Sequence, residues 1–128
     1  MGDEVASFFD DFVDAFLSFT GSRIAARYLV PGVAVRADGS IETVQSRADL
    51  ERFFQSAVDA YRLDGCHGIR YRDLDVVPMG ARSVLGTVTW ELLREDGSVL
   101  RQWRQSYNLV RPGTGAAWQI LASTYHVS

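Results

Sequence analysis

The sequence contains no lysine, so all 13 of its basic side chains are arginines. A single cysteine, Cys66, excludes a disulfide within the chain. No apolar run approaches the roughly 20 residues that a membrane-spanning helix requires. The first residues are acidic, whereas the start of a signal peptide is basic. We therefore expect a cytoplasmic protein with no membrane segment.

Basic side chains are also not gathered into a stripe, and the formal net charge is −3. A nucleic-acid-binding protein normally presents a basic surface, so nucleic acid is not an expected partner. The two histidines and the one cysteine lie too far apart in the sequence for a zinc-binding pattern. Gly113-Thr114-Gly115 falls in a turn between extended segments and not at the start of a helix, as a phosphate loop would. No metal and no cofactor are expected.

A chain of 128 residues is long enough for one domain with a substantial core, and we expect a single domain over residues 1–128. Apolar residues at helical spacing predict a helix over 3–19. Thr20-Gly21-Ser22 then breaks this helix and caps a short second one, expected over roughly 22–29 before Pro31-Gly32. Two short strands, 33–37 and 41–44, are expected around Asp38-Gly39. Ser46-x-x-Asp49 then resembles a capping box before a third helix, which ends near Asp64-Gly65.

From His67 to Ser128 the sequence predicts four extended segments joined by short turns, and the first segment ends at the turn Pro78-Met79-Gly80-Ala81. Asp96-Gly97 between two alternating runs is a strong hairpin signal, because both turn positions require positive φ. Alternation predicts strands over 82–95, 98–111 and 115–127, each with one face toward the helices. Helices followed by such a meander indicate an α+β fold in which helices cover one face of an antiparallel sheet.

The order of these elements, with Trp118-Gln119-Ile120 on the last strand, resembles the ketosteroid-isomerase-like superfamily. SnoaL-like polyketide cyclases and nuclear transport factor two belong to the same superfamily. The resemblance covers nearly the whole chain and implies a cone-shaped fold. In it, three N-terminal helices pack on a strongly bent, mostly antiparallel sheet. Because one fold hosts many functions, the resemblance does not specify a reaction.

The resemblance implies a deep, mostly apolar pocket inside the cone, suited to a small hydrophobic or aromatic molecule. Gly86 favours open space there, because it places no side chain among inward-facing apolar residues. The opposing expectation is a core filled by aromatic side chains. Arg101 either reaches solvent at the rim or pairs inside with a ligand carboxylate, Glu91 or Asp14. The expected ligand-binding residues are Phe12, Phe16, Phe54, Gly86, Val88, Trp90, Arg101, Trp103, Gln105, Ile120 and Ala122.

The candidate catalytic residues are Tyr107, His126 and Asp38. Alignment with ketosteroid isomerase carries its two oxyanion donors onto Phe12 and Tyr107 and its base onto Ala37, and the phenylalanine and alanine cannot perform those roles. Tyr107 can still donate a hydrogen bond to a ligand oxygen. Histidine is the residue type best suited to proton transfer near neutral pH, and His126 is expected on the inward face, close to the end of the last strand. Asp38 is either a base or a cap of its own turn.

Two functions remain open. The first is binding of a small apolar or aromatic molecule, with isomerase-, cyclase- or lyase-type proton transfer as an accompanying activity. The alternative is a non-catalytic, dimeric binding or assembly module with a filled core. For either function we expect a homodimer through the sheet face that carries Arg104 and Tyr125, unless that face is simply solvated. The sequence does not decide whether the protein is an enzyme.

Overall fold

The computed structural model describes residues 1–128 and confirms the α+β fold, with three helices and a six-stranded, mostly antiparallel sheet. The second helix is shorter than predicted because Tyr28 and the residues after it form a strand.

No helix combines the length and the apolar character needed to cross a membrane. The elements are α1 (Gly2–Leu17), α2 (Gly21–Ala25), β1 (Tyr28–Val35), β2 (Ile41–Val44), α3 (Arg47–Leu63), β3 (Gly68–Pro78), β4 (Ser83–Leu93), β5 (Val99–Val110) and β6 (Gln119–Tyr125).

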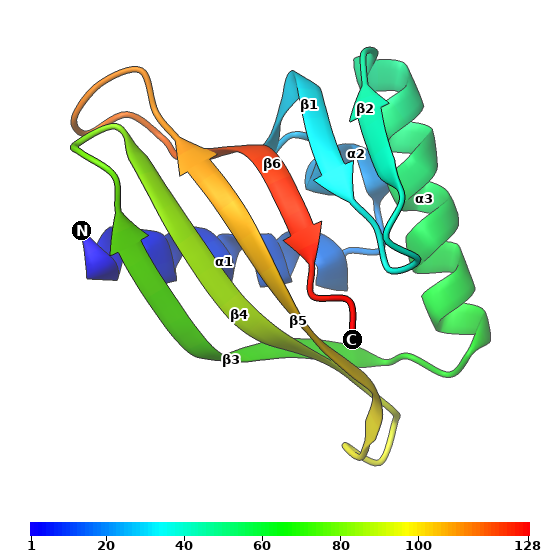
Figure 1. Ribbon diagram of the computed structural model, residues 1–128. Coiled ribbons are helices and arrows are strands. Elements are labelled where there is room, and N and C mark those ends of the chain that lie inside the picture. The colour runs from blue at the N-terminus through cyan, green and yellow to red at the C-terminus, as the bar shows by residue number, and fades with distance from the viewer.

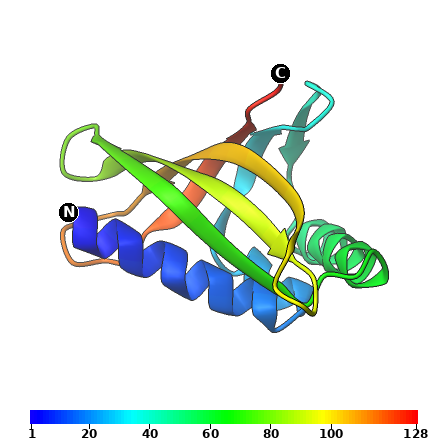
Figure 2. The same ribbon diagram turned by 90° about the horizontal axis from the view of Figure 1, so that it is seen from below.

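The strands are arranged in the order β2-β1-β6-β5-β4-β3, and only β1 and β6 run parallel. The long strands β3, β4 and β5 twist and arch over α1, which lies on the concave side of the sheet (Figures 1 and 2). Helix α3 stands beside β2 at the other end of the sheet (Figure 1). The concave side is therefore covered by α1 at the β3–β4 end and flanked by α3 at the β1–β2 end.

Local sequence signals explain where α3 begins and which side it buries. The Ser46 hydroxyl accepts a hydrogen bond from the Asp49 backbone N–H at 3.3 Å, as the capping pattern predicts. Leu50, Phe54 and Val58 follow at helical spacing and form the buried side of the helix. The amphipathic pattern thus turns one side of α3 toward the sheet.

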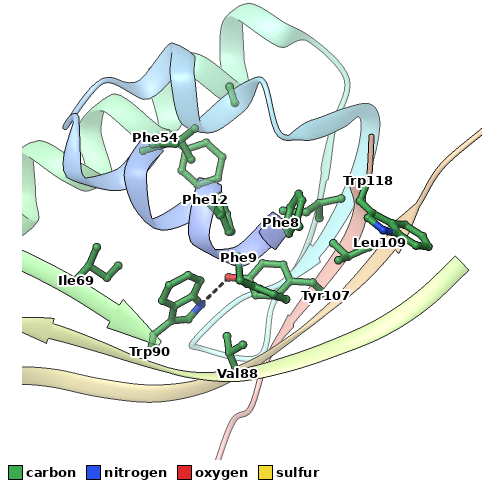
Figure 3. Packing of buried hydrophobic residues seen from close by; sticks show 14 of the residues in the cluster. Phe8, Phe9, Phe12, Phe54, Ile69, Val88, Trp90, Tyr107, Leu109 and Trp118 are labelled. Atoms are coloured by element: carbon green, nitrogen blue, oxygen red, sulfur yellow. Dashed lines mark hydrogen bonds between the residues drawn. The ribbon is translucent and has the colours of Figure 1, made fainter. Parts of the chain in front are cut away.

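The core is an aromatic cluster between α1 and the inner face of β4 and β5. Phe9 and Phe12 are fully buried and make edge-on contacts with Trp90 and Tyr107, with ring centroids 5.6–6.3 Å apart. Such pairs contribute roughly 0.5–1.5 kcal/mol each beyond the area they bury. Inside the cluster the Trp90 indole N–H donates to the Tyr107 hydroxyl at 2.8 Å (Figure 3). The Trp90 N–H is therefore paired with the Tyr107 oxygen within an apolar layer.

A one-residue bulge in β6 changes the side-chain alternation that the sequence predicts. Leu109 pairs with Ile120, whereas Asn108 pairs with Ala122, so β6 has one extra residue between them. After Leu121 the residues of β6 consequently point to the opposite faces from those expected by strict alternation. Ala122 and His126, predicted to face inward, lie on the outer face, and Tyr125 faces inward instead. The inward prediction for Ala122 and His126 was therefore wrong.

A close backbone approach fixes α2 against α3. The Gly21 N–H donates to the Gln55 side-chain oxygen at 2.8 Å, and the Gln55 amide donates to the Phe19 carbonyl at 3.1 Å. A Cβ placed on Gly21 would lie 2.4 Å from the Glu51 carbonyl oxygen and 2.5 Å from the Gln55 backbone nitrogen. Only glycine allows the two helices to meet at this distance, so Gly21 determines where α3 stands.

We predict that Gly21→Ala destabilises the protein by roughly 3 kcal/mol, because the new methyl group would displace backbone atoms and not a flexible side chain. The matched control is Gly113→Ala, since nothing lies within 4 Å of a Cβ at that position. Urea denaturation of both variants measures the difference. Equal stability of the two variants would show that α2 and α3 are not held by this contact.

Candidate functional site

A cavity of about 840 Å³ opens on the concave side of the sheet, between the β1–β2 hairpin, α3 and the inner faces of β4, β5 and β6. Of its 28 lining residues, 19 are hydrophobic, which is typical of a small-molecule site. The volume lies within the range of roughly 300–1,000 Å³ found for ligand pockets. This cavity is the candidate functional site, and it is called the pocket below.

About half of the residues predicted to bind a ligand line the pocket in the structure. Those that line it come from α1, α3, β4 and β5 and share an orientation toward the space between the sheet and α3. They are Phe16, Phe54, Trp90, Arg101, Trp103 and Gln105, together with the catalytic candidate Tyr107.

Phe12, Val88 and Ile120 are at most 1% exposed and belong to the core, where they do not line the pocket. Gly86 also contributes no open space. A Cβ at Gly86 would lie 3.0 Å from the Phe9 ring, so α1 already occupies the volume that the glycine leaves. The interpretation of Gly86 as a source of pocket volume was therefore wrong.

Tyr107 lies at the inner end of the pocket, only 3% exposed. Its hydroxyl accepts the Trp90 indole N–H, and it donates no hydrogen bond to another protein group. Burial, reinforced by the nearby Tyr28, raises the pKa of Tyr107 well above its usual value of 10. The phenol therefore stays neutral over the physiological pH range and retains its proton.

Two flat aromatic side chains form a wall of the pocket nearer its mouth. The rings of Trp103 on β5 and Tyr125 on β6 stack at 6.1 Å between centroids, with an angle of 10° between their planes. The Trp103 indole N–H donates to the Gln105 side-chain oxygen at 2.9 Å. The wall is thus apolar on its faces, and the Gln105 amide N–H groups are left as hydrogen-bond donors.

Arg101 reaches the rim, which was one of the two alternatives open from the sequence. Its guanidinium is half exposed, lies 3.8 Å from the Asp64 carboxylate and sits over the Tyr61 ring at 5.8 Å. The partners considered for an inward arginine, Glu91 and Asp14, are not the ones it contacts. Glu91 lies on the outer face, where it pairs with Arg70 at 2.8 Å.

Asp38 lies at the exposed tip of the β1–β2 turn and does not line the pocket. Its carboxylate accepts hydrogen bonds from the Ser40 hydroxyl at 2.6 Å and the Ser40 N–H at 2.9 Å. These bonds lower the pKa of Asp38 below its usual value. The carboxylate therefore caps its own turn, and its basicity is weakened at a position outside the pocket.

His126 stands on the outer face of the sheet, with its Nε2 atom 2.8 Å from the Ser106 hydroxyl. The Ser106 hydroxyl also lies 2.7 Å from that of Thr87, whose position on β4 faces away from the helices. The sheet itself consequently separates the histidine from the pocket. Of the three catalytic candidates, only Tyr107 reaches the pocket.

Sequence reasoning missed five hydroxyl-bearing residues that line the pocket: Tyr28, Thr43, Tyr61, Ser123 and Tyr125. Tyr28 was assigned to the second helix, and the bulge in β6 exchanged the faces of Ser123 and Tyr125. Tyr61 follows the helical repeat of α3, and that repeat could have placed it beside Phe54. Burial raises the pKa of both Tyr28 and Tyr61, so these phenols also remain protonated.

No group of three or more histidine, cysteine, aspartate or glutamate side chains is arranged to hold a metal ion. The charged side chains at the pocket occur near its rim, where Arg36 forms an ion pair with Glu42. The chemistry that the pocket offers is therefore apolar and aromatic contact combined with hydrogen bonds from neutral hydroxyl and amide groups.

Several solved structures share this fold at low sequence identity. Aln2 from a Streptomyces species is 16% identical, with a TM-score of 0.74 and coverage of 95% of this chain and 86% of that one. A putative calcium/calmodulin dependent protein kinase II association domain from Xanthomonas campestris is 17% identical, with a TM-score of 0.68 and coverage of 98% and 86%. The yeast UBP3-associated protein BRE5 is 17% identical, with a TM-score of 0.73 and coverage of 99% and 97%.

At these identities the likeness shows the fold alone. No curated protein matches the chain. A family model described as "NTF2-like protein (DUF6841)" matches residues 3–128, which confirms the superfamily expected from the order of elements and Trp118-Gln119-Ile120. The chain belongs to this NTF2-like family.

Proposed function

We propose that this protein binds a small apolar or aromatic molecule in the pocket. The observation that carries the proposal is the 840 Å³ cavity with 19 hydrophobic residues among the 28 that line it. A core filled by its own aromatic side chains, the basis of the alternative assembly function, would leave no space of this size. The aromatic cluster of α1 fills only the end of the concave face near β3 and β4.

The shape of the walls supports an aromatic ligand. The stacked Trp103–Tyr125 pair presents flat rings on the sheet side, and Phe53 and Phe54 on α3 add two further aromatic side chains. Aromatic rings bury a large area and interact favourably with one another in offset or edge-on arrangements. A planar molecule placed between the sheet and α3 would gain both kinds of contact.

The proposal is for binding and does not include proton transfer by the three candidate residues. Acid–base catalysis requires a group that titrates near the working pH within reach of the substrate. His126 lies across the sheet from the pocket and Asp38 lies at a turn outside it. Tyr107 lines the pocket, but its raised pKa suits it to donating a hydrogen bond and not to exchanging a proton at neutral pH.

We also propose that the outer sheet face forms a homodimer contact. The charged groups on this face are already paired within the chain: Arg104 binds Asp75 at 2.7 Å and Thr89 at 3.1 Å, and Glu91 binds Arg70. Charges that are paired before association lose less hydration free energy on burial than unpaired ones. Tyr125, predicted for this face, lies on the opposite one and is not part of the proposed contact.

The ligand-binding proposal predicts a thermal shift with members of a panel of flat hydrophobic ketones, steroids, polyketide-like aromatics and small aromatic acids. A ligand at about 100 times its Kd should add about 2.7 kcal/mol to the free energy of unfolding. Ala57→Trp, which places a large side chain into the pocket from α3, should abolish the shift.

Ala60→Trp provides the matched control, because Ala60 lies on the same helix, is exposed and does not line the pocket. Its thermal shift should equal that of the wild-type protein. The absence of a shift across the whole panel, or an unchanged shift in Ala57→Trp, would argue against binding at this site.

The dimer proposal predicts that Arg104→Glu dissociates the protein into monomers, because it would place an unpaired acid beside Asp75. Sedimentation velocity on wild-type and variant protein measures the change in mass. Leu63→Glu, at a position 89% exposed at the end of α3, is the control and should remain dimeric. A wild-type protein that sediments as a monomer at high concentration would refute the proposal.

A further inference from the structure

Two tryptophans that line the pocket, Trp90 and Trp103, donate hydrogen bonds to the side-chain oxygens of two other lining residues, Tyr107 and Gln105. We infer that the ligand is an uncharged aromatic molecule bearing carbonyl oxygen, which accepts hydrogen bonds from Tyr107 and Gln105. This inference rests on the proposed function and names the chemistry that the pocket selects. It follows from the direction of two hydrogen bonds and from the placement of the charged side chains.

The first hydrogen bond joins Trp90 on β4 to Tyr107 on β5. An indole N–H can only donate, so the Tyr107 oxygen is the acceptor, at 2.8 Å. Figure 3 marks this bond with a dashed line. The Tyr107 proton then has no acceptor among the protein groups around it, which include the rings of Phe9 and Phe12. A ligand oxygen in the pocket would supply the missing acceptor.

The second hydrogen bond repeats this arrangement two residues earlier on the same face of β5. The Trp103 indole N–H donates to the Gln105 side-chain oxygen at 2.9 Å, which leaves the amide N–H groups of Gln105 to donate. Residues two apart on a strand are separated by about 7 Å, so both donors can meet one fused-ring ligand. Tyr28 and Tyr61 also line the pocket and place two further phenol groups around it.

The charges around the pocket exclude an anion at its inner end. The charged side chains that line it each have a partner of opposite sign within the chain: Arg36 with Glu42, Asp49 with Arg52 and Arg101 with Asp64. Tyr107, Trp90, Tyr28 and Phe54 at the inner end carry no charge. A carboxylate placed among them would lose its hydration without gaining a counter-ion, whereas a carbonyl loses much less.

The inference is tested with three naphthalene derivatives of similar shape: 2-acetylnaphthalene, 2-isopropenylnaphthalene and 2-naphthoate. Their Kd values for the wild-type protein are measured by the quenching of tryptophan fluorescence. We expect the ketone to bind roughly tenfold more tightly than the alkene, the usual contribution of a satisfied hydrogen bond in a buried site. The carboxylate should bind more weakly than the ketone.

The double variant Tyr107→Phe/Gln105→Met removes both donors and keeps similar side-chain volumes, and it should bind ketone and alkene equally. Tyr71→Phe is the matched control, because Tyr71 donates to Asp10 at 2.7 Å away from the pocket. It should retain the preference for the ketone. Should the double variant fail to fold, Gln105→Met alone should reduce the preference.

Infrared spectroscopy of the bound ketone gives an independent measurement. Its carbonyl stretch should lie at lower wavenumber in the wild-type protein than in the double variant, because hydrogen bonding weakens the C=O bond. Equal affinities of wild-type protein for ketone and alkene, or tighter binding of 2-naphthoate, would overturn the inference and leave the proposed function in place. Failure of all three compounds to bind would count against the proposed function itself.

Discussion

The packing of two phenylalanines of α1 against Trp90 and Tyr107 determines how the rest of the concave face is used. Phe9 and Phe12 cover the inner face of β4 and β5 completely at that end of the sheet, and Phe9 also fills the volume beside Gly86. Because this cluster is dense, α1 cannot move further along the sheet. The space between the sheet and α3 therefore stays open.

The position of α3 sets the width of that space. Gly21 brings α2 into backbone contact with α3, and Gln55 joins the two helices through hydrogen bonds to Gly21 and Phe19. This contact holds α3, which forms one wall of the pocket, and no side chain of α2 enters the pocket.

The two faces of the sheet have contrasting polar chemistry. On the outer face, arginines and carboxylates form networks in which Glu91 meets Arg70 and Arg104 meets Asp75. At the inner end of the pocket the polar side chains are neutral, and Tyr107 and Gln105 each accept a hydrogen bond from a tryptophan N–H. Polar groups in a dry site are stabilised only when hydrogen-bonded, so the unused donors of Tyr107 and Gln105 distinguish the pocket from the core beside it.

Much of the architecture follows from the sequence by itself, because helical spacing, the Ser46 cap and the Asp96-Gly97 hairpin are local signals. These gave the three helices, the meander and the inward faces of β4 and β5, including Trp90, Trp103, Gln105 and Tyr107. Pairing between distant segments was decided only in the tertiary structure. The parallel pairing of β1 with β6 drew Tyr28 out of the predicted helix.

The bulge at Leu121 likewise follows from the match of β6 to β5, and it turned His126 outward and Tyr125 inward. No pattern within β6 marks that extra residue. The sequence therefore determined the class of fold and most of the aromatic pocket wall. The tertiary structure decided which hydroxyl groups reach the pocket, because a shift of one residue in a strand reverses every side chain that follows it.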